Sequence, residues 1–119
     1  MKDPTIRVML LPKDTNGYGT IFGGVILSQL DLAGAAEARK TTKNRVVTAA
    51  IDRVEFIAPV FVGDLVSFYT ETIKKGKTSI TVRVDVEADR ADGSGRAKVT
   101  EAQVVYVNVD EGGRPKPIN

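Results

Sequence analysis

The most regular feature of the chain is an alternation of apolar and polar residues over residues 78–90. Valine, isoleucine and alanine occupy every second position there, so they lie on one face of an extended chain, with polar residues on the other. Three other runs are rich in β-branched and apolar residues, and short segments with glycine, proline or charged residues separate them. The alternation of one run is interrupted near Asp52–Val54, which indicates a bulge or a bend. Together these patterns predict long strands at residues 46–57, 65–74, 78–90 and 96–109.

A helical pattern replaces the alternation over residues 24–40, where several alanines and Gly34 leave one side of the predicted helix unusually thin. Arg39 and Lys40 close its last turn, as the negative end of a helix dipole favours. A short apolar run at residues 6–11 precedes the helix, and a turn-rich loop joins the two. This order predicts an α+β fold, in which a single helix packs on one face of an antiparallel sheet.

Two of the predicted strands, 46–57 and 65–73, carry apolar residues on both faces. One helix cannot cover so wide a sheet. We therefore expect the remaining apolar surface or the strand edges to meet another subunit, with a dimer as the simplest assembly. The last residues, 110–119, are rich in glycine, proline and charge, which is typical of a loose tail.

The composition is that of a soluble globular domain. The chain has 119 residues, which fits one domain over residues 1–119, and 42% of them are hydrophobic. A net charge of +2 is too small to imply binding to nucleic acid. Because no apolar run is long enough to span a bilayer and the start lacks a signal-peptide pattern, we expect a cytoplasmic protein that does not bind membranes.

Two residue types that often carry chemistry are absent from the chain. It has no cysteine, which removes disulfides, thiolate nucleophiles and cysteine-based zinc sites. It also has no histidine, which excludes Ser-His-Asp and Cys-His catalysis and imidazole metal ligands. Proton transfer near neutral pH must therefore use a carboxylate, a lysine or a tyrosine.

One carboxylate stands out. Between Asp14 and Glu37 the only charged side chain is Asp31, in the middle of the predicted helix. At helical spacing its neighbours are small or apolar, which marks a side that approaches the sheet. Asp31 either lies at the edge of a solvated stripe with its polar neighbours, or is a partly buried general base or nucleophile.

The residues ahead of the helix add two further candidates. Gly23 and Gly24 stand at the predicted helix start, where backbone N–H groups have no partner within the helix. Glycines allow another molecule to approach these donors, so the N–H groups could bind a carbonyl oxygen that becomes an oxyanion. Alternatively, the two glycines only form a tight turn into the helix, with no ligand. Asn16 could orient a water or polarise a carbonyl, although an asparagine in such a loop more often forms a local Asx turn.

Three segments in this order resemble the hotdog-fold acyl-CoA thioesterases, and among them the YciA-type and brain-type cytosolic acyl-CoA hydrolases. They are "LPKDTNGYGTIFGGVILSQLDLAGAAEA", "VVTAAIDRVEFIAPVFVGD" and "KKGKTS". The resemblance runs from Ile6 to about Val109. It implies a bent antiparallel β-sheet wrapped around one long central helix, and dimers with a continuous sheet that usually assemble further into trimers of dimers.

The resemblance also assigns roles to particular residues. The helix carboxylate of the family falls on Asp31 and the asparagine of the brain-type enzymes on Asn16, and the two would act together across the dimer interface, one from each subunit. Gly24, with Gly23, matches the glycines whose backbone N–H faces the thioester carbonyl. The chain departs from its relatives at two positions, with Thr20 where an aspartate is common and Phe22 where the brain-type motif has histidine; we connect both with substrate preference.

The implied reaction is hydrolysis of an acyl-CoA thioester to CoA and a carboxylic acid, with no metal and no cofactor beyond the coenzyme A of the substrate. The resemblance makes the lysine-rich turn a contact for the CoA nucleotide, through Lys74, Lys75, Lys77, Thr78 and Ser79, although by pattern alone it is a soluble turn. An acyl tunnel between subunits would be lined by residues such as Phe22, Ile26 and Phe56. The alternative is a hotdog domain that binds acyl-CoA as a sensor without hydrolysing it. A hotdog dehydratase is disfavoured because its usual histidine is absent.

Overall fold

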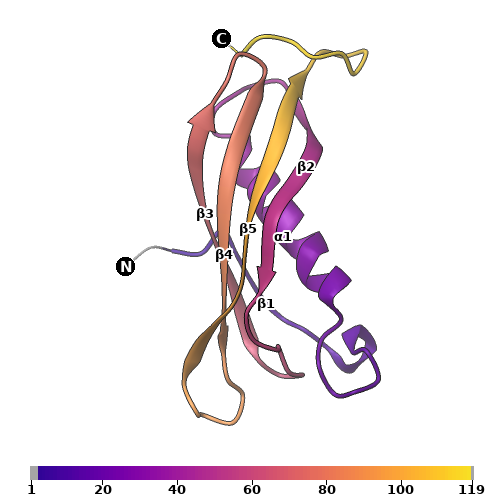
Figure 1. The fold of residues 1–119 in the computed structure, drawn as a ribbon, viewed down its shortest axis with the longest axis vertical. Coiled ribbons are helices and arrows are strands. Elements are labelled where there is room, and N and C mark those ends of the chain that lie inside the picture. The colour runs from indigo at the N-terminus through magenta and orange to yellow at the C-terminus, as the bar shows by residue number, and fades with distance from the viewer. Residues whose placement is uncertain (1–2, 119) are drawn as a thin grey trace.

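The fold is one helix packed against an antiparallel sheet of five strands (Figure 1). The structure is a computed structural model that describes residues 3–118. The strands lie in the order β1-β3-β4-β5-β2. The elements are β1 (Ile6–Met9), α1 (Gly23–Ala38), β2 (Arg45–Phe56), β3 (Leu65–Lys75), β4 (Ser79–Asp89) and β5 (Arg96–Val109). The predicted α+β class and element order are confirmed.

The element boundaries differ slightly from those expected. The first strand ends at Met9, because a short 3-10 helix at Pro12–Asp14 already turns the chain. Helix α1 ends at Ala38, so that Arg39 caps the helix and Lys40 lies beyond its last turn. The long strands agree with the predicted ranges to within one residue at each end.

The core lies between α1 and the inner face of the sheet. Strand β4 shows the cause most clearly, because its alternating valines, isoleucine and alanine are all fully buried while the residues between them are not. Gly34 allows α1 to approach the sheet closely at Tyr106, because a Cβ at this position would lie 2.2 Å from the hydroxyl oxygen of Tyr106. The thin side of the helix predicted from its small residues therefore faces the sheet.

Strand β2 is an edge strand, and most of its residues are exposed. Its register with β5 shifts between Thr48 and Ala50 and again between Asp52 and Glu55. The second shift is the irregularity predicted near Asp52–Val54, and Arg53 there has a φ of 53°, in the left-handed region that non-glycine residues rarely adopt. Large apolar side chains on this strand, Val47, Ile51 and Phe56, remain exposed.

The C-terminal residues are more ordered than the expected loose tail. A turn closes where the N–H of Asp110 donates to the carbonyl of Arg114. Beyond it the N–H of Lys116 donates to Asn108, and the N–H of Ile118 donates to Lys77 in the β3–β4 turn. The side chain of Ile118 packs against the core. Backbone pairing and this apolar contact hold residues 110–118 against the end of the sheet. The glycine and proline content alone had predicted a loose tail.

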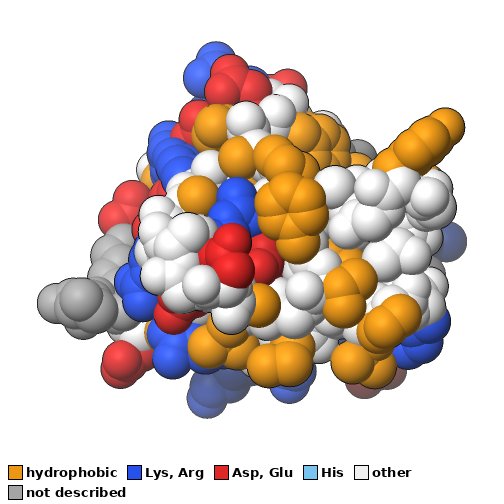
Figure 2. All heavy atoms as spheres, turned by 90° about the horizontal axis from the view of Figure 1, so that it is seen from below, with side chains coloured by type: hydrophobic (Ala, Val, Ile, Leu, Met, Phe, Trp, Pro, Cys, Tyr) orange, Lys and Arg blue, Asp and Glu red, His pale blue; other side chains and the backbone are white. Residues whose placement is uncertain are grey.

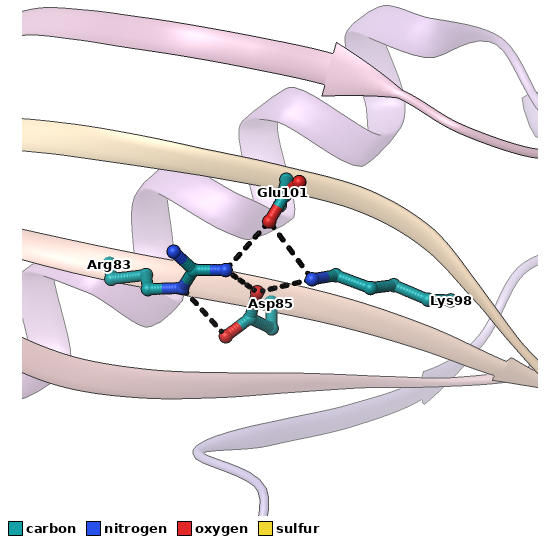
Figure 3. A network of polar contacts seen from close by, with 4 residues as sticks. All are labelled: Arg83, Asp85, Lys98 and Glu101. Carbon is teal, nitrogen blue, oxygen red and sulfur yellow. Dashed lines mark hydrogen bonds and ion pairs between the residues drawn. The ribbon is translucent and has the colours of Figure 1, made fainter.

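The outer face of the sheet carries a network of ion pairs (Figure 3). Arg83 and Lys98 both contact Asp85 and Glu101, at distances of 2.7–3.1 Å. Burial alone would raise the pKa of Asp85, but hydrogen bonds from Arg83 and Lys98 outweigh it and hold that pKa below its usual range. The network ties β4 to β5 on the side away from the helix.

Candidate functional site

Asp31 lies on the part of α1 that faces the junction of β2 and β5. Its carboxylate oxygen Oδ1 accepts a hydrogen bond of 2.7 Å from the hydroxyl of Thr48 on β2, and one of 3.1 Å from the hydroxyl of Tyr106 on β5. The other oxygen, Oδ2, accepts no hydrogen bond from residues 3–118. The sheet thus fixes the orientation of the carboxylate and leaves one oxygen available. Asp31 is partly buried, and its role as a general base or nucleophile stays a prediction.

Tyr106 is the largest fully buried side chain of the core, and the sequence did not reveal its role. Its hydroxyl also lies 2.7 Å from the backbone carbonyl oxygen of Asp31, so one buried donor serves two acceptors of the same residue. Burial raises the pKa of the Tyr106 phenol far above its ordinary value, and the negative charge of Asp31 raises it further. Tyr106 therefore stays protonated at physiological pH and acts as a fixed hydrogen-bond donor.

The start of α1 presents free backbone donors. Gly23 and Gly24 are the first two helical residues, and within the described chain their N–H groups donate no hydrogen bond. Two backbone hydrogen bonds hold the segment in front of them, from the N–H of Ile21 to Val60 and from the N–H of Phe22 to Asp14. The free N–H donors expected at the helix start are therefore present, and the segment before them is held from two sides.

A hollow of about 310 Å³ opens beside this helix start. Gly23, Ile26 and Phe56 contribute to its walls, so two of the three predicted acyl-pocket residues lie side by side here. Phe22 does not line this hollow; its ring lies against Gly24, and the residue is 57% exposed. Apolar side chains are frequent on the surface at this end of the molecule (Figure 2).

Asn16 forms the Asx turn that its loop position suggested. Its side-chain oxygen accepts a hydrogen bond of 2.9 Å from the N–H of Tyr18, and its amide nitrogen donates one of 2.7 Å to the hydroxyl of Thr20. Its side chain is exposed and makes no hydrogen bond to Asp31 within the chain. Thr20, one of the two departures from the relatives, thus fixes the amide of Asn16.

Two predicted parts of the site lie apart within a single chain. Gly24 and Asp31 are seven residues apart on one helix, which corresponds to about 10 Å along its axis. The predicted CoA contacts lie at the opposite end of the molecule from the helix start, in and beside the β3–β4 turn (Figure 1). There the lysines Lys74, Lys75 and Lys77 are exposed, and Thr78 and Ser79 are partly buried.

The described residues contain no cluster of three or more acidic side chains that could hold a metal ion, and none of their helices is long and apolar enough to cross a membrane. The candidate site itself offers a carboxylate with one uncommitted oxygen and two free backbone amides. Such groups can accept a proton or attack a carbonyl carbon, and can stabilise the negative charge that develops on its oxygen.

One helix against a curled five-stranded antiparallel sheet, with a carboxylate oriented by the sheet, defines a protein of the hotdog class. Comparison with known proteins agrees. Residues 18–92 match the thioesterase superfamily. The acyl-CoA thioester hydrolase YciA of Salmonella typhimurium is 40% identical over 95% of this chain and 87% of its own length. The chain therefore belongs to the thioesterase superfamily, with YciA-type acyl-CoA thioester hydrolases as its relatives.

Two solved structures share the fold over nearly the whole chain. Cj0915 of Campylobacter jejuni, a hexameric hotdog fold thioesterase, is 46% identical, with 99% of this chain and 91% of the other covered and a TM-score of 0.93. HI0827, a hexameric broad specificity acyl-coenzyme A thioesterase, is 38% identical, with 100% and 82% covered and a TM-score of 0.91. The hotdog fold inferred from the resemblance is confirmed.

Proposed function

We propose that this chain hydrolyses acyl-CoA thioesters to CoA and a carboxylic acid. The observation that carries the proposal is the carboxylate of Asp31, held through Oδ1 by Thr48 and Tyr106 with Oδ2 uncommitted. The naming of its relatives as acyl-CoA thioester hydrolases supports the same reaction. Without histidine or cysteine in the chain, proton transfer near neutral pH uses a carboxylate, a lysine or a tyrosine, and Asp31 is such a carboxylate.

Asp31 acts on the thioester in one of two ways. As a general base, Oδ2 removes a proton from a water molecule whose oxygen attacks the thioester carbon; the carbon–sulfur bond then breaks and the CoA thiolate takes up a proton. As a nucleophile, Oδ2 attacks the same carbon, CoA leaves, and water hydrolyses the resulting anhydride. In both cases the negative charge collects on the carbonyl oxygen. The N–H of Gly24, with that of Gly23 beside it, would stabilise this charge, and removing one such donor typically costs about 100- to 1000-fold in kcat.

The distance between these groups favours a site shared by two subunits. Gly24 and Asp31 of one helix are about 10 Å apart along its axis, too far for one carbonyl group to contact both. A partner helix packed in the opposite direction would bring its Gly24 and its Asn16 to this Asp31. The exposed edge strand β2, with its apolar Val47 and Ile51, is the surface for such pairing. We infer a homo-oligomer with the dimer as its unit. A trimer of dimers would give six subunits, and Cj0915 and HI0827 are hexameric.

The substrate would lie along this shared interface. The acyl group would enter the hollow beside Gly23, between Ile26 and Phe56, with the exposed Phe22 contributing from the subunit surface. We assign the nucleotide of CoA to the cationic end of the molecule, where Lys77 and its neighbours in the β3–β4 turn provide positive charge.

The direct test compares Asp31→Asn with the wild-type protein on a series of acyl-CoA substrates, with release of free thiol as the readout. We expect loss of turnover while circular dichroism and the oligomeric state remain unchanged. Near wild-type hydrolysis by a folded Asp31→Asn protein would contradict the proposal. Saturable binding of acyl-CoA by the wild type without thiol release would instead identify a sensor.

A mixing experiment tests the shared site. Asp31→Asn and Asn16→Ala chains are each expected to be inactive as pure assemblies. If the two residues act across the interface, a mixed dimer contains one site with both residues intact, so unfolding, mixing and refolding the two variants restores part of the activity. If both residues of a site belong to one chain, the mixture stays inactive, and the shared site is wrong.

A further inference from the structure

At the end of the sheet where α1 begins, Asp64 and Arg90 form a largely buried ion pair that lies outside the groups described for the thioester site. The carboxylate oxygen Oδ2 of Asp64 is 2.7 Å from Nη1 of Arg90. Their side chains are 2% and 14% exposed, whereas the cations of the network in Figure 3 are 39–40% exposed. The position of this pair in the fold indicates what it does.

The pair holds a short stretch of backbone in the β2–β3 loop, from Pro59 to Phe61. Besides its contact with Asp64, Nη1 of Arg90 donates a hydrogen bond of 2.8 Å to the carbonyl of Pro59. The Oδ2 of Asp64 accepts one of 2.9 Å from the N–H of Phe61. The guanidinium of Arg90 also lies over the Phe61 ring, with Cζ 5.2 Å from the ring centroid. Both ends of the stretch are bound, so the residue between them, Val60, is fixed as well.

The β4–β5 turn in turn fixes the ion pair. The second carboxylate oxygen of Asp64, Oδ1, accepts a hydrogen bond of 3.1 Å from the N–H of Ala91. The backbone N–H of Arg90 donates one of 2.8 Å to the carbonyl of Gly95 across the turn. Figure 1 shows the β4–β5 turn, the β2–β3 loop and the loop before α1 at the same end of the molecule. The pair thus joins the first two of these segments.

The third segment, the loop before α1, is bound to the same stretch of backbone. Ile21, two positions before the first helical residue, donates a hydrogen bond of 2.7 Å from its N–H to the carbonyl of Val60. Thr20 forms an antiparallel bridge with Phe61. The carbonyl of Thr20 also accepts a hydrogen bond of 2.9 Å from the N–H of Asn16. The residues that lead into the helix therefore rest on the backbone that the ion pair holds.

Stability alone does not explain why two charges lie at this place. Removing both from water carries a desolvation cost that their attraction barely repays, so a buried ion pair adds little net stability compared with apolar side chains. A buried polar pair can instead specify one arrangement of the chain. Here that arrangement puts the carbonyl of Val60 opposite the N–H of Ile21.

We propose that Asp64 and Arg90 are positioning residues for the free amides at the start of α1. They act through Val60 and Ile21 and do not contact the substrate. The inference rests on the proposed hydrolysis, in which these amides stabilise the charge on the thioester oxygen. A displacement of about 1 Å in a catalytic group, caused by a change far from it, costs about 100-fold in rate. Loss of the pair frees the backbone under Ile21, and the helix start shifts with it.

The test measures thiol release from acyl-CoA by Arg90→Gln and Asp64→Asn, at a temperature where circular dichroism shows each protein folded. We expect kcat to fall about 10- to 100-fold in each variant, while KM changes less than about twofold. The two constants separate because the amides bind the carbonyl oxygen most strongly as its charge develops. The double variant should be no slower than the slower single variant, since the two residues act as a unit.

Two further variants separate positioning from a general loss of stability. Arg83→Gln breaks an ion pair of the same 2.7 Å length, with Glu101 on the outer face, and should keep the wild-type kcat. Arg90→Lys keeps the charge and a donor, so it should recover part of the lost kcat, and it replaces Arg90→Gln if that protein does not fold. Wild-type kcat values in the folded Arg90→Gln and Asp64→Asn proteins would overturn the proposal. An equal fall in Arg83→Gln would overturn it too, because any lost ion pair would then have the same effect.

Hydrogen exchange followed by mass spectrometry gives a readout that needs no substrate. In Arg90→Gln the amide protons of the peptide containing Ile21 should exchange at least about tenfold faster, while a peptide from the middle of β4 exchanges as in the wild type. If the wild type hydrolyses no acyl-CoA, the proposed function is wrong, but faster exchange confined to the Ile21 peptide still supports the placement of the helix start by the ion pair. Equal exchange of this peptide in Arg90→Gln and wild type would refute the placement in either case.

Discussion

The close approach of α1 to the sheet at Gly34 gives the sharpest test of how the site is built. A Cβ at this position would lie 2.2 Å from the hydroxyl oxygen of Tyr106 and 3.0 Å from the ring carbon that bears it. Tyr106 is fully buried, so its ring cannot swing into solvent. In Gly34→Ala either the phenol or the helix must therefore shift by about 1 Å in a closely packed core.

The structure sets the expected magnitudes. Overpacking of this kind costs about 1–3 kcal/mol, while replacing glycine by alanine inside a helix returns about 0.5–1 kcal/mol, which leaves a net loss of up to about 2.5 kcal/mol. The shift also breaks the hydrogen bond of 3.1 Å from Tyr106 to the carboxylate of Asp31. A hydrogen bond to a charged group is worth about 1.5–3 kcal/mol, so we expect kcat to fall at least about tenfold.

Urea unfolding and thiol-release kinetics measure both effects. Ala36→Gly, at an exposed position of the same helix, reports the propensity difference alone. Tyr106→Phe removes the clashing oxygen, so Gly34→Ala should be less destabilising in that background than in the wild type, by about 1 kcal/mol or more. Additive free energies of unfolding in this double-mutant cycle, or a Gly34→Ala protein more stable than the wild type, would refute the reasoning.

Three further changes test other parts of the molecule. Thr48→Val removes the 2.7 Å hydrogen bond to Asp31 without changing the side-chain shape, so kcat should fall about tenfold with KM nearly constant. Thr48→Ser keeps the hydroxyl and should retain activity, whereas equal kcat values in Thr48→Val and wild type would argue against this orienting role. Ile51→Lys places a charge on the exposed edge strand β2 and should convert the oligomer to smaller species in sedimentation velocity experiments; an unchanged assembly would exclude β2 as the interface. For Asp64, burial alone raises the pKa, but backbone N–H groups and Arg90 at 2.7 Å outweigh it and hold the pKa below its usual range. The folded state therefore binds this proton more weakly than the unfolded chain. The stabilisation by the Asp64 carboxylate is present above the unfolded pKa of about 4 and is lost as the pH falls through the lower folded pKa. In Asp64→Asn the free energy of unfolding, measured by urea unfolding at acidic pH, should therefore depend less on pH than in the wild type.

Much of the fold followed from the sequence because its signals are local. Alternation over residues 78–90 reports one buried face of a strand, and the break near Asp52–Val54 reports a bulge, whatever the partner strands are. The same holds for the helix start at Gly23 and for the isolation of Asp31 among uncharged residues, since both are visible within one or two helical turns of sequence. The roles of these residues in hydrolysis remain predictions that the experiments above address.

The tertiary structure alone decided which groups surround Asp31. Thr48 and Tyr106 are 17 and 75 residues away from it, and they meet at its carboxylate because β5 pairs with β2 at the edge of the sheet. Local periodicity predicts a strand and its buried face, but it does not predict which strands pair. From the sequence, a tyrosine in an apolar strand is therefore predicted only to be a core residue. Asn108 was hidden for the same reason, because its link between a loop and the C-terminal tail exists only once both have folded against β5. The residues supply the chemistry locally, and the order of the strands decides which of them share a hydrogen bond.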